Sequence, residues 1–199
     1  MRWNVTLDNP LLWHNLRAAP VDTMISHRKE VKMPFDAKSV ANFFLETAQA
    51  NGQTIDPMKL QKLVYYAHGW YAGYTGEPLI NESIEAWPYG PVVPSLYHEF
   101  KQFGAGPIRA KAQRFNGTNG FYEVPPPTDA NIRQFLTNVW KSYGRYTGTA
   151  LSEMTHAADG PWWRARQQSN GMRSADIPFH LIAEHFRAAA QRTQPVPAQ

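Results

Sequence analysis

The sequence predicts a mainly α-helical (α+β) fold, a single compact helical domain around a central helix at residues 57–74. Several segments repeat apolar residues at three- and four-residue intervals, the spacing of an amphipathic helix. Between them, the prolines within residues 88–94 exclude a continuous helix. The stretch NGTNG at residues 116–120 is typical of a hairpin tip. We therefore expect a small antiparallel β element near residues 84–89 and 107–124.

The composition is that of one globular domain. Of 199 residues, 43% are hydrophobic and 18% are charged, an ordinary balance for a folded protein. The absence of cysteine excludes disulfides, thiolate zinc sites and a cysteine nucleophile. The net charge of +4 supports nucleic-acid binding only weakly. No segment approaches the roughly 20 apolar residues of a membrane-spanning helix, so we expect a cytoplasmic protein with no membrane partner.

Three regions are predicted along the chain. Residues 1–33 form an N-terminal appendage that contains two internal methionines, Met24 and Met33, as alternative translation starts. Residues 34–192 contain no linker or repeat and are expected to form the folded domain. Residues 193–199 are rich in proline and glutamine and are expected to be a disordered tail.

The first two helices have clear boundary signals. Asp36 is a helix N-cap candidate, and Asn51-Gly52 ends the helix that follows it. Asp56 and Pro57 open the central helix, because proline is tolerated in a first turn. Its predicted buried stripe is Leu60, Leu63, Val64, Ala67, Tyr71 and Tyr74. Gly69 and Gly73, four residues apart, would let another backbone approach this helix closely.

The middle of the chain changes pattern repeatedly. Residues 80–93 predict a short edge strand and a rigid turn, and residues 95–103 predict a helix that Gly104 and Gly106 end. Residues 108–124 predict a hairpin. After three prolines, Thr128 is expected to cap a strong helix that buries Ile132, Phe135, Leu136, Val139, Trp140 and Tyr143. A shorter helix at residues 150–156 is followed by a break at Gly160-Pro161, and the last helix covers residues 178–192.

Three stretches together resemble a known family. They are residues 57–70 (PMKLQKLVYYAHGW) with 75–79 (TGEPL), residues 84–95 (IEAWPYGPVVPS), and residues 151–156 (LSEMTH) followed by GPW at 160–162 and Arg166. In this order they are similar to the Panacea antitoxin domain, found in SocA-like and phage-associated proteins. The resemblance covers about residues 34–190.

The resemblance implies a mostly helical domain that serves as the antitoxin of a toxin–antitoxin pair. Its partner would be a cognate toxin, which it would neutralise by direct binding. The alternative within the family is a proteolytic adaptor that delivers the toxin to the Clp protease. A nucleic-acid-binding regulator is a further alternative that rests on the basic residues of the predicted hairpin, although the chain has no recognisable added DNA-binding segment that would support regulation of its own operon.

The candidate partner-binding residues are aromatic and cationic, the types that dominate interface hot spots. They are Lys59, Lys62, Tyr66, Trp70, Trp87, Tyr89, Arg109, Arg114 and Arg166. Tyr66 and Trp70 either pack beneath the following loop or anchor a partner. Glu85 either holds a buried cation such as Lys62 or Arg166 or is an ordinary surface charge.

Enzymatic chemistry has little support, and no catalytic residue, metal or cofactor is predicted. A hydrolase hypothesis would use His68, His98 or His156, but no two histidines share a zinc-binding spacing with an intervening glutamate. Serine-nucleophile and phosphate-loop motifs are also missing. We expect structural roles for these histidines, with the imidazole of His156 bonded to a backbone carbonyl.

The stretch between residues 100 and 122 is the best basic patch, since it contains Lys101, Arg109, Lys111 and Arg114 and no acidic residue. Interleaved aromatics allow three interpretations: a solvated hairpin face, a contact with an acidic toxin surface, or an RNA or DNA site. Nucleic acid is the least favoured of the three.

Overall fold

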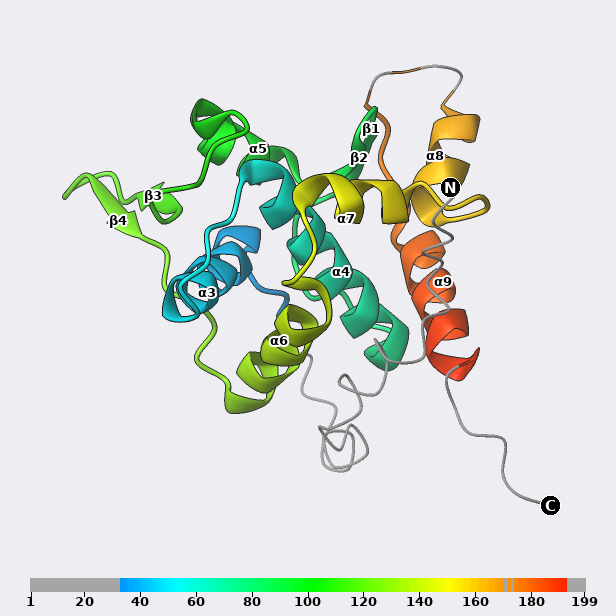
Figure 1. The fold of residues 1–199 in the computed structure, drawn as a ribbon, viewed down its shortest axis with the longest axis horizontal. Coiled ribbons are helices and arrows are strands. Elements are labelled where there is room, and N and C mark those ends of the chain that lie inside the picture. Colours follow the sequence, from blue (N-terminus) through cyan, green and yellow to red (C-terminus); the bar gives the residue numbers. More distant parts are fainter. Residues whose placement is uncertain (1–32, 170–171, 173, 193–199) are drawn as a thin grey trace.

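The computed structural model describes residues 33–169, 172 and 174–192 (Figure 1). The predicted tail and all of the predicted appendage except Met33 lie outside the described residues. The described helices are α3 (Ala37–Ala50), α4 (Pro57–Thr75), α5 (Pro94–Phe100), the 3-10 helix η1 (Lys101–Phe103), α6 (Ala130–Tyr143), α7 (Gly148–Thr155), α8 (Pro161–Gln168) and α9 (Phe179–Arg192). The strands are β1 (Glu85–Trp87), β2 (Gly90–Val92), β3 (Gln113–Phe115) and β4 (Phe121–Glu123). A bilayer-spanning helix, long and apolar throughout, does not occur among the described residues.

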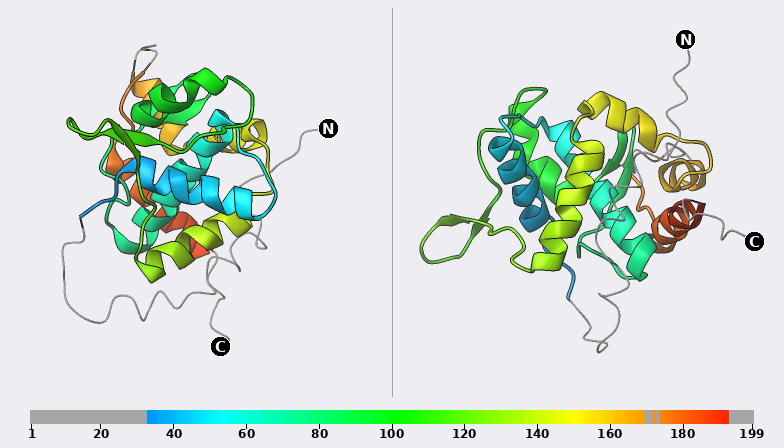
Figure 2. Two further views of the ribbon diagram at one scale, coloured as in Figure 1. Left: turned by 90° about the vertical axis from the view of Figure 1, so that its left-hand side faces the viewer. Right: turned by 60° about the horizontal axis from the view of Figure 1, so that its bottom comes forward.

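Helix α4 lies at the centre of the domain, in contact with α3, α5, α6, α7, α9 and β2 (Figures 1 and 2). It begins as predicted: the Asp56 carboxylate accepts a hydrogen bond from the Lys59 backbone N–H at 2.8 Å, and Pro57 occupies the first turn. The sequence predicted one buried stripe on α4, but more of the helix is buried than that. Every side of α4 is covered, and residues 59–70 are all buried. Polar side chains on such a helix must find their partners inside the protein.

Helix α9 lies directly against α4 at two glycines, which confirms the predicted close approach. A Cβ atom at Gly69 would lie 2.2 Å from the Phe186 ring, and one at Gly73 would lie 2.7 Å from the Phe186 carbonyl carbon. Phe186 fills this space and packs edge-to-face on Trp70, with the ring centroids 5.0 Å apart. Only glycine fits at these two positions of α4.

Most helix boundaries agree with the sequence, with two corrections. The carboxylate of Asp129, not the hydroxyl of Thr128, caps α6 and accepts a hydrogen bond from the Ile132 N–H at 2.9 Å. Gly160-Pro161 was expected only to break the chain, but Gly160 is the N-cap of α8 and Pro161 occupies its first turn. Proline favours a helix start as much as it disfavours a helix interior, and this signal was missed.

The β structure consists of two separate antiparallel hairpins, so the fold is mainly α with a small β content, not all-helical. Strands β1 and β2 pair Glu85 with Val92 and Trp87 with Gly90, as expected near residues 84–89. The β3–β4 hairpin turns at Gly117 and Gly120, both with positive φ, as residues 116–120 predicted.

Asn42 of α3 fixes the base of the β3–β4 hairpin. Its side-chain N–H groups donate to the carbonyls of Ala112 and Val124 at 3.0 and 2.7 Å, and its side-chain oxygen accepts from the Ala112 N–H at 2.7 Å. Beyond this base the hairpin projects from the body of the domain (Figures 1 and 2).

The contact between α4 and α9 gives a stability prediction. Gly69→Ala should lower the free energy of unfolding by about 1–3 kcal/mol, because overpacking against the Phe186 ring outweighs the better helix propensity of alanine. Chemical denaturation of both proteins measures the difference.

Phe186→Leu provides the control. Combined with Gly69→Ala, it should cost less than the sum of the two single changes, since the smaller side chain relieves the contact. Additive costs would contradict this account of the glycine.

Candidate partner-binding site

The strongest candidate site is the loop around β1 and β2, residues 86–93, named here the proline turn. Pro88 and Pro91 fix two φ angles of this loop, and Gly90 has φ +100°, a conformation that side chains disfavour. At the edge of the turn, the Ala86 N–H donates to the Ala175 carbonyl at 2.7 Å, so the segment before α9 pairs with β1. The backbone of the turn is therefore restricted from within and at its edge.

Side chains from α4, α7 and α8 hold the proline turn by donating hydrogen bonds to its carbonyl groups. The Lys62 ammonium on α4 donates to the Pro91 carbonyl at 2.9 Å. Ser152 of α7 donates from its hydroxyl to the Tyr89 carbonyl at 2.7 Å, and Trp162 of α8 donates from its indole N–H to the Trp87 carbonyl at 2.8 Å.

Two further side chains complete this set of hydrogen bonds. Gln61 makes a paired interaction with Val93, donating to its carbonyl at 3.1 Å and accepting from its N–H at 2.9 Å. Arg166 donates to the Ala86 carbonyl at 3.4 Å and to the Met172 carbonyl at 2.7 Å. The bonds from Gln61 and Arg166 to the turn each join residues at least 32 positions apart in the sequence, so the turn keeps its shape only while the helices are packed.

Gly90 is required at the centre of the turn for space as well as for its backbone angle. A Cβ atom there would lie 2.6 Å from the Thr155 hydroxyl and 2.8 Å from the Lys62 nitrogen. The turn thus lies in direct contact with α4 and α7, and no side chain separates it from the Lys62 ammonium.

The outer side of the proline turn presents an aromatic surface. Tyr89 is 72% exposed at the tip. Trp87 is half-buried, packs edge-to-face on Tyr97 with the ring centroids 4.7 Å apart, and donates from its indole to the Glu85 carboxylate at 2.6 Å. The Glu85 carboxylate therefore bonds the Trp87 indole, and it does not pair with the buried Lys62.

Lys62 is a buried cation whose charge is poorly compensated. Among the described residues no carboxylate pairs with it, and burial lowers its pKa from the usual 10.5 to about 7. His156 is near enough for Lys62 to help lower the histidine pKa, although desolvation is the larger cause. The proline turn therefore rests on an amine that is partly neutral near physiological pH.

Four of the predicted partner-binding residues are not on the surface: Lys59, Lys62, Tyr66 and Trp70 are all buried. Lys59 donates to the Gly144 carbonyl at 2.6 Å. The expectation of an outer aromatic and cationic face on the central helix was wrong, because α6, α7 and α9 cover that face.

The two buried aromatics of this set belong to the core. The Tyr66 ring stacks on Tyr143 with the centroids 4.3 Å apart, and the Trp70 indole donates to the Tyr143 hydroxyl at 2.9 Å. Both therefore pack inside the protein, the structural alternative that the sequence left open.

The other predicted residues fall into two groups. Trp87, Tyr89 and Arg166 lie together in or beside the proline turn. Arg109 and Arg114 lie elsewhere, before and within the β3–β4 hairpin. Gln61, Ser152 and Trp162 also hold the proline turn, but the sequence did not predict this. Their polar groups lie inside recognisable motifs, yet the turn that they bond is remote in the chain.

Half of the cations in the basic stretch around the β3–β4 hairpin are held in ion pairs. Arg114 forms an ion pair with Asp36, the N-cap of α3. Lys111 lies 2.9 Å from Glu46 and 3.3 Å from Glu123. Two of the four cations predicted to form a basic patch thus have acidic partners from other parts of the chain, which weakens the case for a phosphate-binding surface.

Within the described part of the chain, no three potential metal-ligating side chains gather around these histidines. His68 is buried, accepts a hydrogen bond from the Ile80 N–H at 3.4 Å, and has a pKa lowered to about 4 by burial. His156 packs on Trp162, with the ring centroids 4.0 Å apart. Its Nε2 atom finds no partner among the described residues, so the carbonyl contact predicted for it is not seen at that nitrogen.

Comparison with known proteins identifies the family. The model of the antitoxin SocA-like, Panacea domain matches residues 60–163. Antitoxin SocA of Caulobacter vibrioides (strain NA1000 / CB15N) is 38% identical over 128 residues, which are 64% of this chain and 68% of that protein. This chain belongs to the SocA-like Panacea antitoxin family. No solved structure matches it.

The family match covers the proline turn and the side chains that bond it, as well as the β3–β4 hairpin. The matched region contains the whole turn together with Gln61, Lys62, Ser152 and Trp162, the side chains that bond its carbonyls. The three stretches that carried the resemblance in the sequence therefore meet at one place in the structure. Family membership supports an antitoxin role for this chain.

The buried lysine predicts a pH dependence. Between about pH 7 and pH 10 the unfolded chain keeps the Lys62 proton while the folded protein releases it, so the free energy of unfolding should rise with pH, by at most roughly 1.4 kcal/mol per pH unit. Denaturation at a series of pH values measures this slope.

Lys62→Met should flatten the slope, and Lys59→Met is the matched control. Burial also lowers the pKa of Lys59, but less of that side chain is desolvated and Asp56 opposes the shift, so its replacement should change the slope less. Equal slopes for the wild type and Lys62→Met would contradict the assignment.

Proposed function

We propose that this antitoxin neutralises its toxin by direct protein–protein binding, and that the proline turn is part of the contact surface. The observation that carries the proposal is a largely exposed tyrosine on a loop whose carbonyl groups are already bonded to the protein core. Tyrosine is enriched at binding hot spots, and a loop that is ordered before binding loses little entropy in the complex.

The surface chemistry supports a protein partner over nucleic acid. The turn presents the exposed Tyr89 beside the half-buried Trp87, while Lys111 and Arg114 are held in ion pairs. Binding through an aromatic anchor needs no chemical step. We place the binding unit within residues 34–192, the predicted domain.

Growth rescue tests the proposal. Each protein encoded beside the gene for this chain is expressed from an inducible promoter, with and without the chain. One neighbour should arrest growth, and the full chain should relieve the arrest and co-purify with that protein. Failure of rescue with every neighbouring product would remove direct neutralisation.

The amount of toxin in rescued cells separates binding from delivery to a protease. Neutralisation by binding leaves intact toxin in a complex in cells that contain Clp. Disappearance of the toxin in those cells, with its return in cells that lack Clp, would favour the adaptor role instead.

Tyr89→Ala should abolish rescue and weaken the purified complex about tenfold or more, the loss expected for an aromatic hot spot. Its melting temperature should stay close to that of the wild type, because the side chain is largely in solvent. Calorimetric titration and thermal denaturation measure the two quantities.

Tyr122→Ala is the matched control for Tyr89→Ala, since it removes another exposed tyrosine at a distance from the turn. It should rescue growth like the wild type. Normal binding by Tyr89→Ala, or an equal loss in both variants, would show that the proline turn is not the contact.

A further inference from the structure

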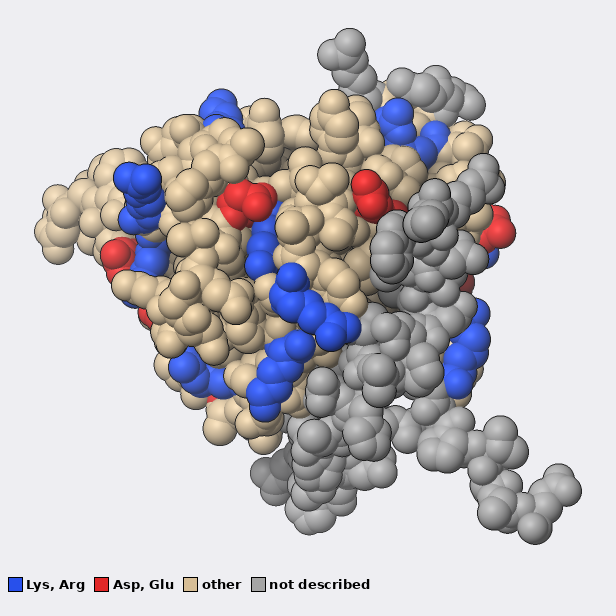
Figure 3. Space-filling view, in the orientation of Figure 1, with Lys and Arg blue, Asp and Glu red and all other residues tan. Residues whose placement is uncertain are grey.

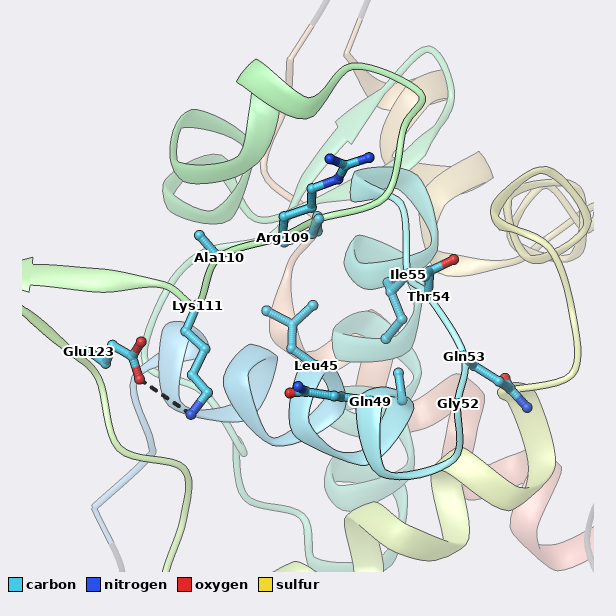
Figure 4. A pocket seen from close by; sticks show the side chains of 12 residues that line it. Leu45, Gln49, Gly52, Gln53, Thr54, Ile55, Arg109, Ala110, Lys111 and Glu123 are labelled. Carbon is cyan, nitrogen blue, oxygen red and sulfur yellow. Dashed lines mark ion pairs between the residues drawn. The ribbon is translucent and has the colours of Figure 1, made fainter.

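A second surface lies at the base of the β3–β4 hairpin, where α3, residues 52–55 and residues 108–111 enclose a cleft of about 520 Å³ (Figure 4). Its inner wall is apolar and includes Leu45, Ala48, Ile55 and Ile108. In Figure 4, Leu45 and Ile55 lie in the middle, with Arg109 on one side and the ion pair of Lys111 and Glu123 on the other. The cleft has room for one or two apolar side chains.

The cleft continues onto one face of the hairpin. Side chains alternate along a strand, so Glu123, at the cleft, and Phe121 share a face of β4. Phe115 is paired with Phe121 across the hairpin, with the ring centroids 5.3 Å apart, and the two are 59% and 71% exposed. Arg114 and Tyr122 form the neighbouring pair and lie on the opposite face.

The charges around this surface indicate what it can bind. Lys111 is occupied by Glu46 and Glu123, whereas Arg109 is exposed and has no acidic partner among the described residues. The outer end of the hairpin, at the left of Figure 3, shows no charged side chain. A protein binds a nucleic acid through several free cations that contact the phosphate backbone. One free arginine beside an apolar cleft and two aromatic rings fits an acidic and apolar peptide better.

The backbone beside the cleft has polar groups that are free to bond a partner's backbone. The Ile108 N–H donates to the Ile55 carbonyl at 2.8 Å, and the Ala112 carbonyl accepts from the Val124 N–H at 3.0 Å. Residues 109–111 between them make no backbone hydrogen bond with the described residues. Free N–H and C=O groups at the surface are available to pair with the backbone of a partner segment.

We infer that the cleft and the Phe115–Phe121 face together bind an extended segment of the toxin, with an apolar side chain in the cleft and a carboxylate beside Arg109. The inference rests on the proposed function, which supplies the partner. It adds a second contact, separated from the proline turn by α5 (Figure 1), and gives the chemistry of the segment that occupies it.

Paired variants of the full chain test the inference. The probe is the protein encoded by the neighbouring gene whose growth arrest the chain relieves. Arg109→Glu and Phe121→Ala should each raise the dissociation constant about tenfold or more. Lys101→Glu matches the first, because it makes the same charge change at another exposed cation. Tyr122→Ala matches the second, because it removes the adjacent ring on the opposite face of β4. Both controls should bind within about threefold of the wild type.

Three results would overturn the inference while the wild type still binds. Wild-type affinity in both Arg109→Glu and Phe121→Ala would show that the surface is unused. An equal loss in Lys101→Glu would indicate diffuse electrostatic attraction. Displacement of the toxin from the hairpin by a single-stranded oligonucleotide, with steep salt dependence, would assign the surface to nucleic acid. Failure of the wild type to bind any neighbouring product would instead refute the proposed function itself.

Discussion

The burial of α4 on every side is the constraint on which the rest of the structure depends. A helix surrounded by other elements cannot leave its polar side chains in solvent, and an unsatisfied polar group in the interior costs roughly 1–3 kcal/mol. Gln61 and Lys62 meet this requirement by bonding carbonyls of the proline turn. The helix that forms the core therefore also determines the shape of the exposed loop above it.

This arrangement links fold stability to binding geometry. The proline turn receives hydrogen bonds from α4, α7 and α8, and Gly90 brings it against Lys62 and Thr155 without an intervening side chain. Helix α9 packs on Gly69 and Gly73, further along α4 towards its C-terminal end. Tyr89 is thus displayed on a rigid support, which reduces the entropy lost when a partner binds.

The distribution of charge also depends on packing between distant segments. The hairpin sequence contains basic residues without acidic neighbours, yet in the fold α3 supplies Asp36 and Glu46 to Arg114 and Lys111. Exposed ion pairs such as these contribute little stability. They remove free positive charge from the hairpin, however, and leave its aromatic rings as the main contact chemistry.

The sequence by itself determined what depends on neighbouring residues: the start of α4 at Asp56 and Pro57, the glycine tip of the β3–β4 hairpin, and the close approach permitted by Gly69 and Gly73. It also contained the three stretches that resemble the antitoxin family. Only the tertiary structure decided that Tyr66 and Trp70 are core residues, that Ser152 and Trp162 hold the proline turn, and that Lys111 and Arg114 of the basic stretch are paired with carboxylates. Capping and turn signals act within a few residues, whereas burial and pairing depend on segments brought together from 60 or more residues away, such as Ser152 and Tyr89, which are 63 positions apart.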